Sequence, residues 1–425
     1  MNALLVGLGG CREVGRSAFL LDAGEKFLLD CGIKLTPEGT EYPSHVDTNI
    51  AAAIISHAHL DHSGNLPHLF LKSNPLCYMT PPTLELAEIL WHDTLKIAGI
   101  EGTVEKFSKE EIRRTKRYSF PLGYKRKIEI SPNVSLEFFN AGHILGAAMT
   151  RLEFKSFSFL YTGDFKAEET RLHEKADLKT GKNDFVLMES TYGDRDHPDR
   201  LKEEKAFVER VKETVEGGGH ALIPAFAVGR SQEIVDVLFE HKVKFPVFLD
   251  GMSQKAALVS LKYPEYLKAA KQLRNSHKKV EWVRTKKDRL RALDEPSAIV
   301  TTAGMLEGGP ILSYIKQLWN DPSSSILITG YQVDGTQGKR LLEEGVIHID
   351  GRDYKVECLV EKFDFSAHAS QTEMVESVKK WSPRQVLLVH GEFEKAMALK
   401  KRIKEESGID TVILERDKPH KLDLS

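Results

Sequence analysis

Residues 54–62 read Ile-Ile-Ser-His-Ala-His-Leu-Asp-His and carry four side chains of metal-binding type directly after an apolar run. The four are His57, His59, Asp61 and His62. If the apolar run is a strand that ends near Ser56, two-residue alternation puts the first two histidines on one side. A turn would then bring Asp61 and His62 towards a second position. Imidazoles and carboxylates are common zinc ligands, so the stretch predicts two metal ions rather than one, and not a solvated polar loop.

Polar residues end three further apolar runs. His143 follows VSLEFFN, Asp164 follows FSFLYTG, and His390 follows RQVLLV. Each lies beside a glycine, where backbone can approach a shared site closely. Four ligands cannot complete two metal shells, so we expect these three residues to join them. Asp164 is suited to bridge the two ions.

Composition limits the class of protein. A chain of 425 residues suggests two or three domains. Lys and Arg (60) nearly balance Asp and Glu (62), and the net charge of −2 excludes a globally basic nucleic-acid binder. The chain has no apolar run of about 18 residues, so no transmembrane helix is predicted. MNALLVGLGG lacks the basic start of a signal peptide, and the four cysteines have no CxxC spacing, so a cytoplasmic location is expected.

Short apolar runs in the first two hundred residues predict strands, with one helix over residues 82–99. The predicted strands are 2–8, 16–22, 26–30, 51–56, 133–139, 149–154, 157–162 and 184–189. From about residue 200 a helical segment, 201–216, is followed by strand–helix units such as ALIPAF and GRSQEIVDVLFEHK. This alternation predicts a parallel sheet and therefore a second α/β domain. After Tyr354, the run RQVLLVHGE again ends in the way that the strands of the first domain end. The chain is therefore predicted to return to the first domain, with the second domain inserted into it.

These residues together resemble the motifs of the metallo-β-lactamase fold and its β-CASP nucleases. The four lactamase motifs are matched by Asp30 in FLLDCG, HAHLDH, His143 and Asp164, and the three β-CASP motifs by Glu189 in MESTYGD, His368 in DFSAHAS and His390 in LLVHGE. SHAHLDHSGNLP, PAFAVGRSQE and AGMLEGGP are most similar to the branch of the cleavage and polyadenylation specificity factor endonuclease and its archaeal counterparts, which is related to RNase J. The resemblance spans residues 7 to about 401.

The resemblance implies an α/β fold in which an αββα metallo-β-lactamase sandwich, residues 1–193 and 362–425, carries an inserted α/β β-CASP domain, residues 194–361. It also implies two zinc ions per chain. His57, His59 and His143 would hold one ion, Asp61, His62 and His390 the other, and Asp164 would bridge them. Asp30 would orient a ligating imidazole. His368 would be the general acid and Glu189 its orienting partner, and Asp61 and Asp30 are also counted with the catalytic residues.

Substrate contacts are expected in a cleft between the two domains. The candidates for this role are Arg230, Gly308, Gly309, Ser366 and Ser370. Two basic stretches, residues 109–127 and 278–291, are further candidates for binding RNA, and Trp282 in the second could stack on a base. Either stretch can equally be a solvated helix face.

The predicted function is a zinc-dependent ribonuclease of RNA processing or decay. A metal-bridging hydroxide would attack a phosphodiester of single-stranded RNA, and His368 would protonate the leaving 3′ oxygen. The products would carry 5′-phosphate and 3′-hydroxyl ends. Endonuclease and 5′-to-3′ exonuclease modes both stay open, as does a homodimer.

Three alternatives are weighed against this prediction. A small-molecule hydrolase of the same fold, such as a thioesterase, would not need the β-CASP motifs. The DNA nucleases of the interstrand-repair branch typically have Val in place of His390. A non-catalytic scaffold would not retain every metal ligand. KH-type RNA-binding modules often precede the lactamase domain in the archaeal branch, whereas the predicted strands here begin at residue 2. RNA affinity is therefore expected from the catalytic core.

Overall fold

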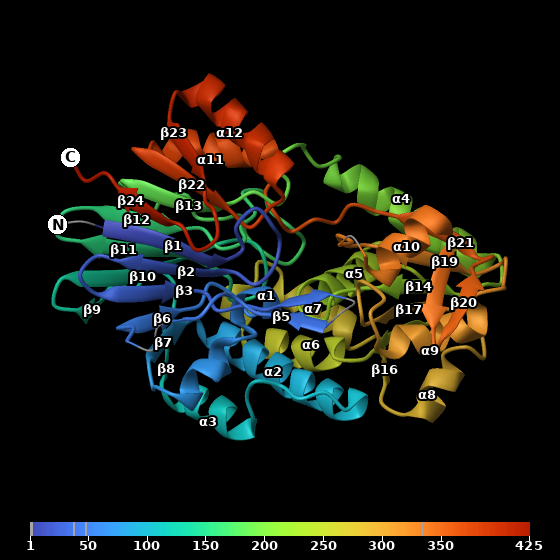
Figure 1. Ribbon diagram of the computed structural model, residues 1–425. Coiled ribbons are helices and arrows are strands. Elements are labelled where there is room, and N and C mark those ends of the chain that lie inside the picture. The colour runs from blue at the N-terminus through green and yellow to red at the C-terminus, as the bar shows by residue number, and fades with distance from the viewer. Residues whose placement is uncertain (1–2, 37–38, 47–48, 334) are drawn as a thin grey trace. The chain divides into compact units, whose positions relative to one another are not determined.

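A computed structural model describes residues 3–36, 39–46, 49–333 and 335–425 (Figure 1). The chain divides into two compact units, each with its own core. The first unit joins Met1–Asp196 to Ala367–Ser425, and the second is His197–Ser366. The first unit is therefore built from two parts of the chain that are far apart in sequence.

Two sheets form the centre of the first unit. In one, the strand order is β24 (Pro419–Leu422), β1 (Ala3–Gly9), β2 (Ala18–Asp22), β3 (Lys26–Leu29), β6 (Ala52–Ile54), β7 (Leu76–Met79) and β8 (Ser119–Pro121). In the other, it is β23 (Asp410–Ile413), β22 (Gln385–Val389), β13 (Phe185–Glu189), β12 (Ser158–Tyr161), β11 (Ala148–Phe154), β10 (Val134–Asn140) and β9 (Ile128–Ser131). A separate hairpin joins β4 (Lys34–Thr36) to β5 (Gly39–Glu41).

Alternate residues of these strands form the core between the two sheets. Phe19 and Leu21 of β2 and Phe27 and Leu29 of β3 are buried in one cluster with residues of the second sheet. Leu136, Phe138, Leu152, Phe159, Phe185 and Leu387 are among the residues that the second sheet contributes. The period of two in each strand thus directs one apolar face inwards.

Helices cover the outer faces of both sheets (Figure 1). The helices α2 (Pro81–Glu101) and α3 (Lys109–Arg117) lie on the side of the first sheet, and α11 (Gln371–Trp381) and α12 (Phe393–Ser407) lie on the side of the second. Two short elements, α1 (Leu60–Ser63) and η1 (Leu66–Leu71), follow β6. Thr80 caps the first turn of α2, and Gly102 ends this helix with φ of 70°. The first unit is therefore an αββα sandwich.

The second unit contains a parallel six-stranded sheet. Its order is β16 (Glu281–Val283), β15 (Val247–Asp250), β17 (Ala298–Thr301), β14 (Ala221–Pro224), β18 (Ser325–Ile328) and β21 (Leu359–Lys362). Leu222 packs into a different core from its neighbours Ala221 and Ile223, which shows that both faces of the sheet are covered. The helical elements are α4 (Arg200–Glu216), α5 (Arg230–Glu240), α6 (Ser253–Lys262), η2 (Pro264–Tyr266), α7 (Ala270–His277), α8 (Lys286–Arg291), α9 (Pro310–Leu318) and α10 (Gln337–Glu344). A hairpin of β19 (Val346–Ile349) and β20 (Arg352–Lys355) completes the unit.

The predicted fold class, α/β, is confirmed. All eight predicted strands are present as β1, β2, β3, β6, β10, β11, β12 and β13, with ends shifted by up to two residues. The helices predicted over 82–99 and 201–216 are α2 and α4. The predicted start of the first strand at residue 2 lies outside the described residues. Among the described helices, none is both long and apolar enough to span a bilayer.

Candidate metal centre

The strand directions bring distant polar residues to one edge of each sheet in the first unit. In the second sheet, β12, β13 and β22 are parallel, and β10 runs in the same direction because two antiparallel pairings separate it from β12. The carboxyl ends of these strands carry or precede His143, Asp164, Glu189 and His390. In the first sheet β3 is parallel to β6, which places Asp30 at the same edge as the loop that carries His57.

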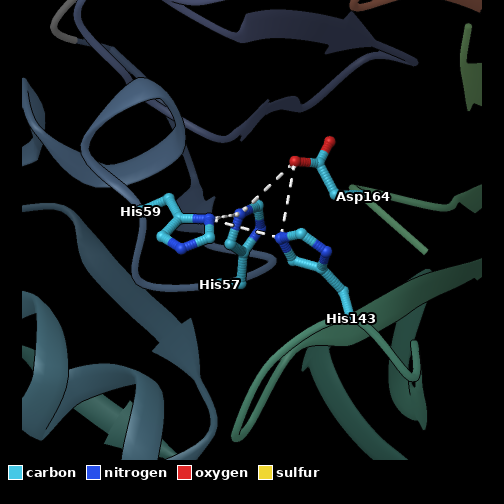
Figure 2. Close-up of side chains that lie close together, drawn as sticks. All are labelled: His57, His59, His143 and Asp164. Atoms are coloured by element: carbon cyan, nitrogen blue, oxygen red, sulfur yellow. Dashed lines mark hydrogen bonds and ion pairs between the residues drawn. The ribbon is translucent and has the colours of Figure 1, made fainter. Parts of the chain in front are cut away.

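Three imidazoles converge beside Asp164 in the first cluster (Figure 2). The Nδ1 atom of His59 lies 3.2 Å from Nε2 of His57 and 3.2 Å from Nε2 of His143. Oδ2 of Asp164 is 3.6 Å from Nε2 of His57 and 3.8 Å from Nε2 of His143. The cluster therefore presents three nitrogen atoms and one oxygen atom to a common point.

The reason for the convergence of His57 and His59 differs from the prediction. The strand β6 ends at Ile54, two residues before the expected end, so strand alternation does not orient the two imidazoles. Both follow the strand in a turn, and His59 is the residue that precedes α1. The first turn of this short helix then carries Asp61 and His62 round to the second cluster.

The second cluster also includes Asp164. Its Oδ2 atom lies 3.3 Å from Nε2 of His62, and its Oδ1 atom lies 3.2 Å from Nδ1 of His390. Oδ2 of Asp61 is 3.2 Å from Nε2 of His390 and 3.7 Å from Nε2 of His62. Asp164 thus contacts both clusters, and the seven predicted metal ligands lie together.

Asp30 is fully buried behind the second cluster and accepts hydrogen bonds from three residues. His62 Nδ1 is 2.6 Å from Oδ2, and the Tyr161 hydroxyl donates to the same oxygen at 2.7 Å. The Ser56 amide and hydroxyl groups donate at 2.7 Å to Oδ1 and Oδ2, respectively. Asp30 therefore holds the His62 ring with Nε2 directed at Asp164. Its backbone φ of 59° is unusual for a residue with a Cβ, as is the φ of 46° at His390.

The donor set fits divalent metal ions. Four ligand atoms at tetrahedral corners about 2.0–2.1 Å from a zinc ion lie about 3.3–3.4 Å apart, which is close to the separations in both clusters. Burial lowers the pKa of His57, His59 and His143, so their imidazoles are neutral and can offer lone pairs. Within the described residues, the buried Nε2 of His62 and Oδ1 of Asp164 make no hydrogen bond. Metal ligation would satisfy both atoms.

His368 lies next to these clusters and is paired with Glu189. Its Nδ1 is 2.8 Å from Oε2 of Glu189 and 3.9 Å from Oδ2 of Asp164. Burial lowers the pKa of His368, but the carboxylates of Glu189 and Asp164 outweigh it and raise the value to about 9. The His368 imidazole therefore keeps its proton at neutral pH beside the two clusters.

Most of the predicted substrate residues lie outside the first unit. Arg230 begins α5 and forms an ion pair with Glu233, while Gly308 and Gly309 precede α9. Ser366 is the last residue of the second unit. Ser370 caps α11 in the first unit, where its hydroxyl accepts the Glu373 amide hydrogen bond. The structure therefore does not bring the five together in one unit, and their role stays a prediction.

Some of the basic residues in the two stretches form ion pairs with neighbouring acidic side chains. In residues 109–127, Lys116 pairs with Glu88, Arg113 with Glu110, Lys125 with Asp177 and Lys127 with Glu153. In residues 278–291, Arg289 pairs with the buried Asp250, and Arg291 with Glu281. The indole of Trp282 packs against the core and donates to the His277 carbonyl oxygen at 3.2 Å. These contacts give part of each stretch a structural role, and RNA binding by either stretch stays a prediction.

Sequence reasoning missed several residues that support the site. Tyr161 directly precedes TGD and Ser56 directly precedes HAHLDH, so adjacency to a motif was the available signal for both. Lys166 and Glu373 form a buried ion pair 207 positions apart in sequence, with Nζ to Oε2 at 2.6 Å. The spacing of residues carries no signal for such a pair.

Known proteins resemble the chain over nearly its whole length. Family models match as a Metallo-beta-lactamase superfamily domain over residues 19–192, a Beta-Casp domain over 232–341 and a Zn-dependent metallo-hydrolase RNA specificity domain over 353–414. Probable RNase MJ4 of Methanocaldococcus jannaschii is 39% identical over 403 residues, 92% of this chain and 94% of that protein. RNase aCSPSF2 of Saccharolobus solfataricus is 34% identical over 418 residues, 97% of this chain and 84% of that protein.

A solved structure shares the fold at low sequence identity. The crystal structure of a protein of unknown function from Enterococcus faecalis V583 matches with a TM-score of 0.62 and 14% identity, over 99% of this chain and all of that chain. The combination of family models, full-length relatives and clustered metal-type ligands leads to one conclusion. The chain belongs to the metallo-β-lactamase/β-CASP family.

Proposed function

We propose that the chain is a zinc-dependent ribonuclease that hydrolyses phosphodiester bonds of single-stranded RNA. The observation that supports this most strongly is the position of Asp164, which contacts both ligand clusters and also lies near His368. A site of this kind suits hydrolysis with two metal ions and a separate proton donor. RNA as the substrate is supported by the two archaeal relatives, which are named as RNases, and by the RNA specificity domain match.

The ligands divide into two sets in this proposal. His57, His59 and His143 would hold one ion, Asp61, His62 and His390 would hold the other, and Asp164 would be shared by both sites. Zinc ions bound there would neutralise phosphate oxygens and lower the pKa of the attacking water. The carbonyl oxygen of Ala367 lies 2.9 Å from Nδ1 of His143 and so directs Nε2 of this ring at the cluster.

His368 supplies the proton that the leaving group needs. Hydrolysis adds one water across the P–O3′ bond, so that phosphorus gains the hydroxyl oxygen and O3′ gains a proton. Because Nδ1 of His368 bonds to Glu189, the proton to be transferred is the one on Nε2. Glu189 also accepts the Phe165 amide hydrogen bond at 2.8 Å, which fixes the carboxylate relative to Asp164. The products carry a 5′-phosphate and a 3′-hydroxyl.

The second unit would contribute substrate contacts. We infer that it corresponds to the inserted β-CASP domain predicted for residues 194–361, and that the lactamase domain comprises 1–193 and 362–425. Arg230, the glycines Gly308 and Gly309, and the serines Ser366 and Ser370 are proposed to contact the RNA backbone. The action of the enzyme would be endonucleolytic, 5′-to-3′ exonucleolytic or both, according to how the 5′ end is bound.

Elemental analysis together with RNA cleavage tests the proposal. Active protein is expected to contain two zinc ions per chain, and chelation should abolish cleavage until zinc is restored. RNA labelled at either end and carrying a 5′-triphosphate, 5′-phosphate or 5′-hydroxyl would separate the two modes by product size. Parallel assays with DNA of the same sequence and with a thioester test whether either is a better substrate than RNA. One ion per active chain, or preference for DNA or the thioester, would overturn the proposal.

A further inference from the structure

The segment that carries His368 is attached to the segment that carries Asp164 by a set of buried contacts. The Ala369 amide donates to the Phe165 carbonyl oxygen at 2.6 Å. Two residues before Ala369, the carbonyl oxygen of Ala367 meets the His143 ring. The backbone on both sides of His368 is therefore held against residues of the metal centre.

A buried ion pair extends this attachment beyond the backbone. Nζ of Lys166, two positions after Asp164, lies 2.6 Å from Oε2 of Glu373. Lys166 and Glu373 are 6% and 8% exposed, so solvent screens their attraction only weakly. The same Oε2 atom accepts the Ser370 amide hydrogen bond at 2.9 Å, which closes the first turn of α11. Lys166 thus contacts Glu373, the carboxylate that caps the start of α11 just after His368.

The backbone of Lys166 connects to a third part of the site. Its amide donates to the Ala141 carbonyl oxygen at 2.8 Å, and Ala141 is two residues before His143. Its own carbonyl oxygen accepts the Ala176 amide hydrogen bond at 2.8 Å. Lys166 is therefore fixed at its backbone before its ammonium group reaches Glu373. A fixed donor of this kind restricts where the start of α11 can lie.

We propose that Lys166 and Glu373 are positioning residues that set the place of the His368 imidazole relative to the leaving oxygen. The inference rests on the proposed role of His368 as general acid. Neither side chain needs to touch RNA or metal for this role. A displacement of about 1 Å in a catalytic group can cost on the order of 10²-fold in rate. Loss of the pair should therefore slow the step that needs a proton and leave the metal ligands in place.

The test uses the full-length double variant Lys166→Met/Glu373→Gln. Met retains most of the apolar stem of Lys, and Gln can still accept the Ser370 amide hydrogen bond, so the capping box of α11 is preserved. Removal of both charges together avoids a single unpaired buried charge. The matched control is Lys379→Met/Glu406→Gln, which removes a more exposed ion pair between α11 and α12.

Two RNA substrates separate positioning from a general structural effect. One is ordinary single-stranded RNA, and the other has sulfur in place of the scissile 3′ oxygen. A thiolate leaves without protonation, so cleavage of the sulfur substrate does not depend on the acid. We expect kcat of the double variant to fall about 10–100-fold on the oxygen substrate and to stay within about threefold on the sulfur substrate. KM and zinc content should be unchanged, and the control should match the wild type on both substrates.

A measurement without catalysis accompanies the kinetics. Hydrogen exchange of a peptide that covers residues 366–374 should be faster in the double variant, because the Ala369 amide loses protection, and unchanged in the control. Equal loss of activity on both substrates, or unchanged rate and exchange in the double variant, would overturn the inference. If His368→Ala shows the selective loss and the double variant does not, only the positioning role fails. A wild type that cleaves neither RNA would overturn the proposed function and this inference with it.

Discussion

At the scale of single residues, the site combines neutral imidazoles with one imidazole that retains its proton. Burial lowers the pKa of His57, His59 and His143, whereas Glu189 and Asp164 outweigh burial and raise the pKa of His368 to about 9. The pKa values differ because the charged neighbours of each imidazole ring differ, although all four residues are histidines. Histidines a few ångströms apart can therefore serve as metal ligands and as a proton donor.

Replacement of His368 by Ala should separate these two functions. We expect the rate of RNA cleavage to fall about 10²–10⁴-fold, the usual contribution of general acid catalysis, while zinc content stays at the wild-type value. Steady-state kinetics and elemental analysis of the same preparation would measure both. His92→Ala, on the exposed face of α2, is the control and should alter neither. Loss of a zinc ion from the His368 variant would show that His368 is a ligand.

Asp30→Asn tests whether the hydrogen bond between Asp30 and the His62 ring is needed for metal binding. The Asn side chain retains one acceptor oxygen but cannot accept from all three of its present donors, His62, Ser56 and Tyr161. We expect zinc affinity at the second cluster to fall about 10–100-fold, as is typical when an orienting partner of a ligand is removed. Competition with a chromophoric chelator would measure the affinity. Asp22→Asn at the far end of β2 should leave it unchanged, and unchanged affinity in Asp30→Asn would contradict the prediction.

At the scale of elements, the approach of α1 to the loop after β3 depends on a glycine. A Cβ on Gly32 would lie 1.8 Å from the Asp61 carbonyl oxygen, a separation that no side-chain movement can relieve. The Cys31 and Ile33 amides on either side donate to the His62 and Leu60 carbonyl oxygens, so the two segments are joined along their length. The position of α1, and with it of the predicted ligands Asp61 and His62, therefore requires glycine here.

Two Gly→Ala substitutions should consequently have opposite effects. Gly32→Ala should lower the melting temperature and the zinc content, because the loop and α1 must separate. Gly99→Ala in α2, where a Cβ meets nothing within 4 Å, should raise stability by about 0.5–1 kcal/mol through helix propensity. Calorimetry with elemental analysis would measure both effects. Normal zinc content in stable Gly32→Ala protein would contradict the account.

The end of α7 should make the second unit sensitive to acid. His277 is 4% exposed, and burial outweighs its bond to the Leu273 carbonyl oxygen and lowers its pKa to about 4. The folded state therefore favours the neutral ring. The neutral His277 ring contributes about 3 kcal/mol to the free energy of unfolding, in full above the unfolded pKa of about 6.5. This contribution is lost as the pH falls through the folded pKa of about 4.

Chemical denaturation of the wild type and of His277→Gln between pH 4 and 7.5 would test this expectation. The wild type should lose stability more steeply than the variant between pH 6.5 and 4. The variant, which has no ring to protonate, provides the baseline for all other titrating groups. Parallel pH profiles for the two proteins would show that His277 does not titrate differently on folding.

At the scale of the whole molecule, the balanced charge determines how RNA can be bound. The net charge is −2, and several residues of the two basic stretches are paired with acidic side chains. Long-range attraction of the RNA backbone should therefore be weak, and binding should depend on a few local phosphate contacts.

Salt dependence measures the number of these contacts. For single-stranded RNA we expect log K to fall with log salt with a slope of about −3, as about four phosphate contacts would produce. The slow His368→Ala protein allows binding to be measured by fluorescence anisotropy before much RNA is cleaved. We further expect single-stranded RNA to be cut well, and duplex RNA and DNA of the same sequence less readily. A slope steeper than about −7, or efficient cutting within a stable duplex, would contradict this view.

The positions of most strands, and of the His and Asp residues that cluster at the sheet edges, could be predicted because both are local in the sequence. An apolar run with a period of two indicates a strand, and a polar residue beside glycine at its end indicates a site at the sheet edge. The predicted end of β6 was two residues too late because the apolar run continues through Ile55, whose amide still donates to the Tyr78 carbonyl oxygen although the strand ends at Ile54. The hairpin of β4 and β5 and the short η1 have too few residues for a periodic signal.

The sequence by itself therefore determined the α/β fold class and the residues available for chemistry: seven residues of metal-ligand type, and a histidine and a glutamate in further motifs. Only the tertiary structure decided which of these groups meet and what holds them. The bond from Tyr161 to Asp30 and the ion pair from Lys166 to Glu373 join residues 131 and 207 positions apart. Such contacts depend on how separate strands and helices pack, so no local pattern of residues can encode them.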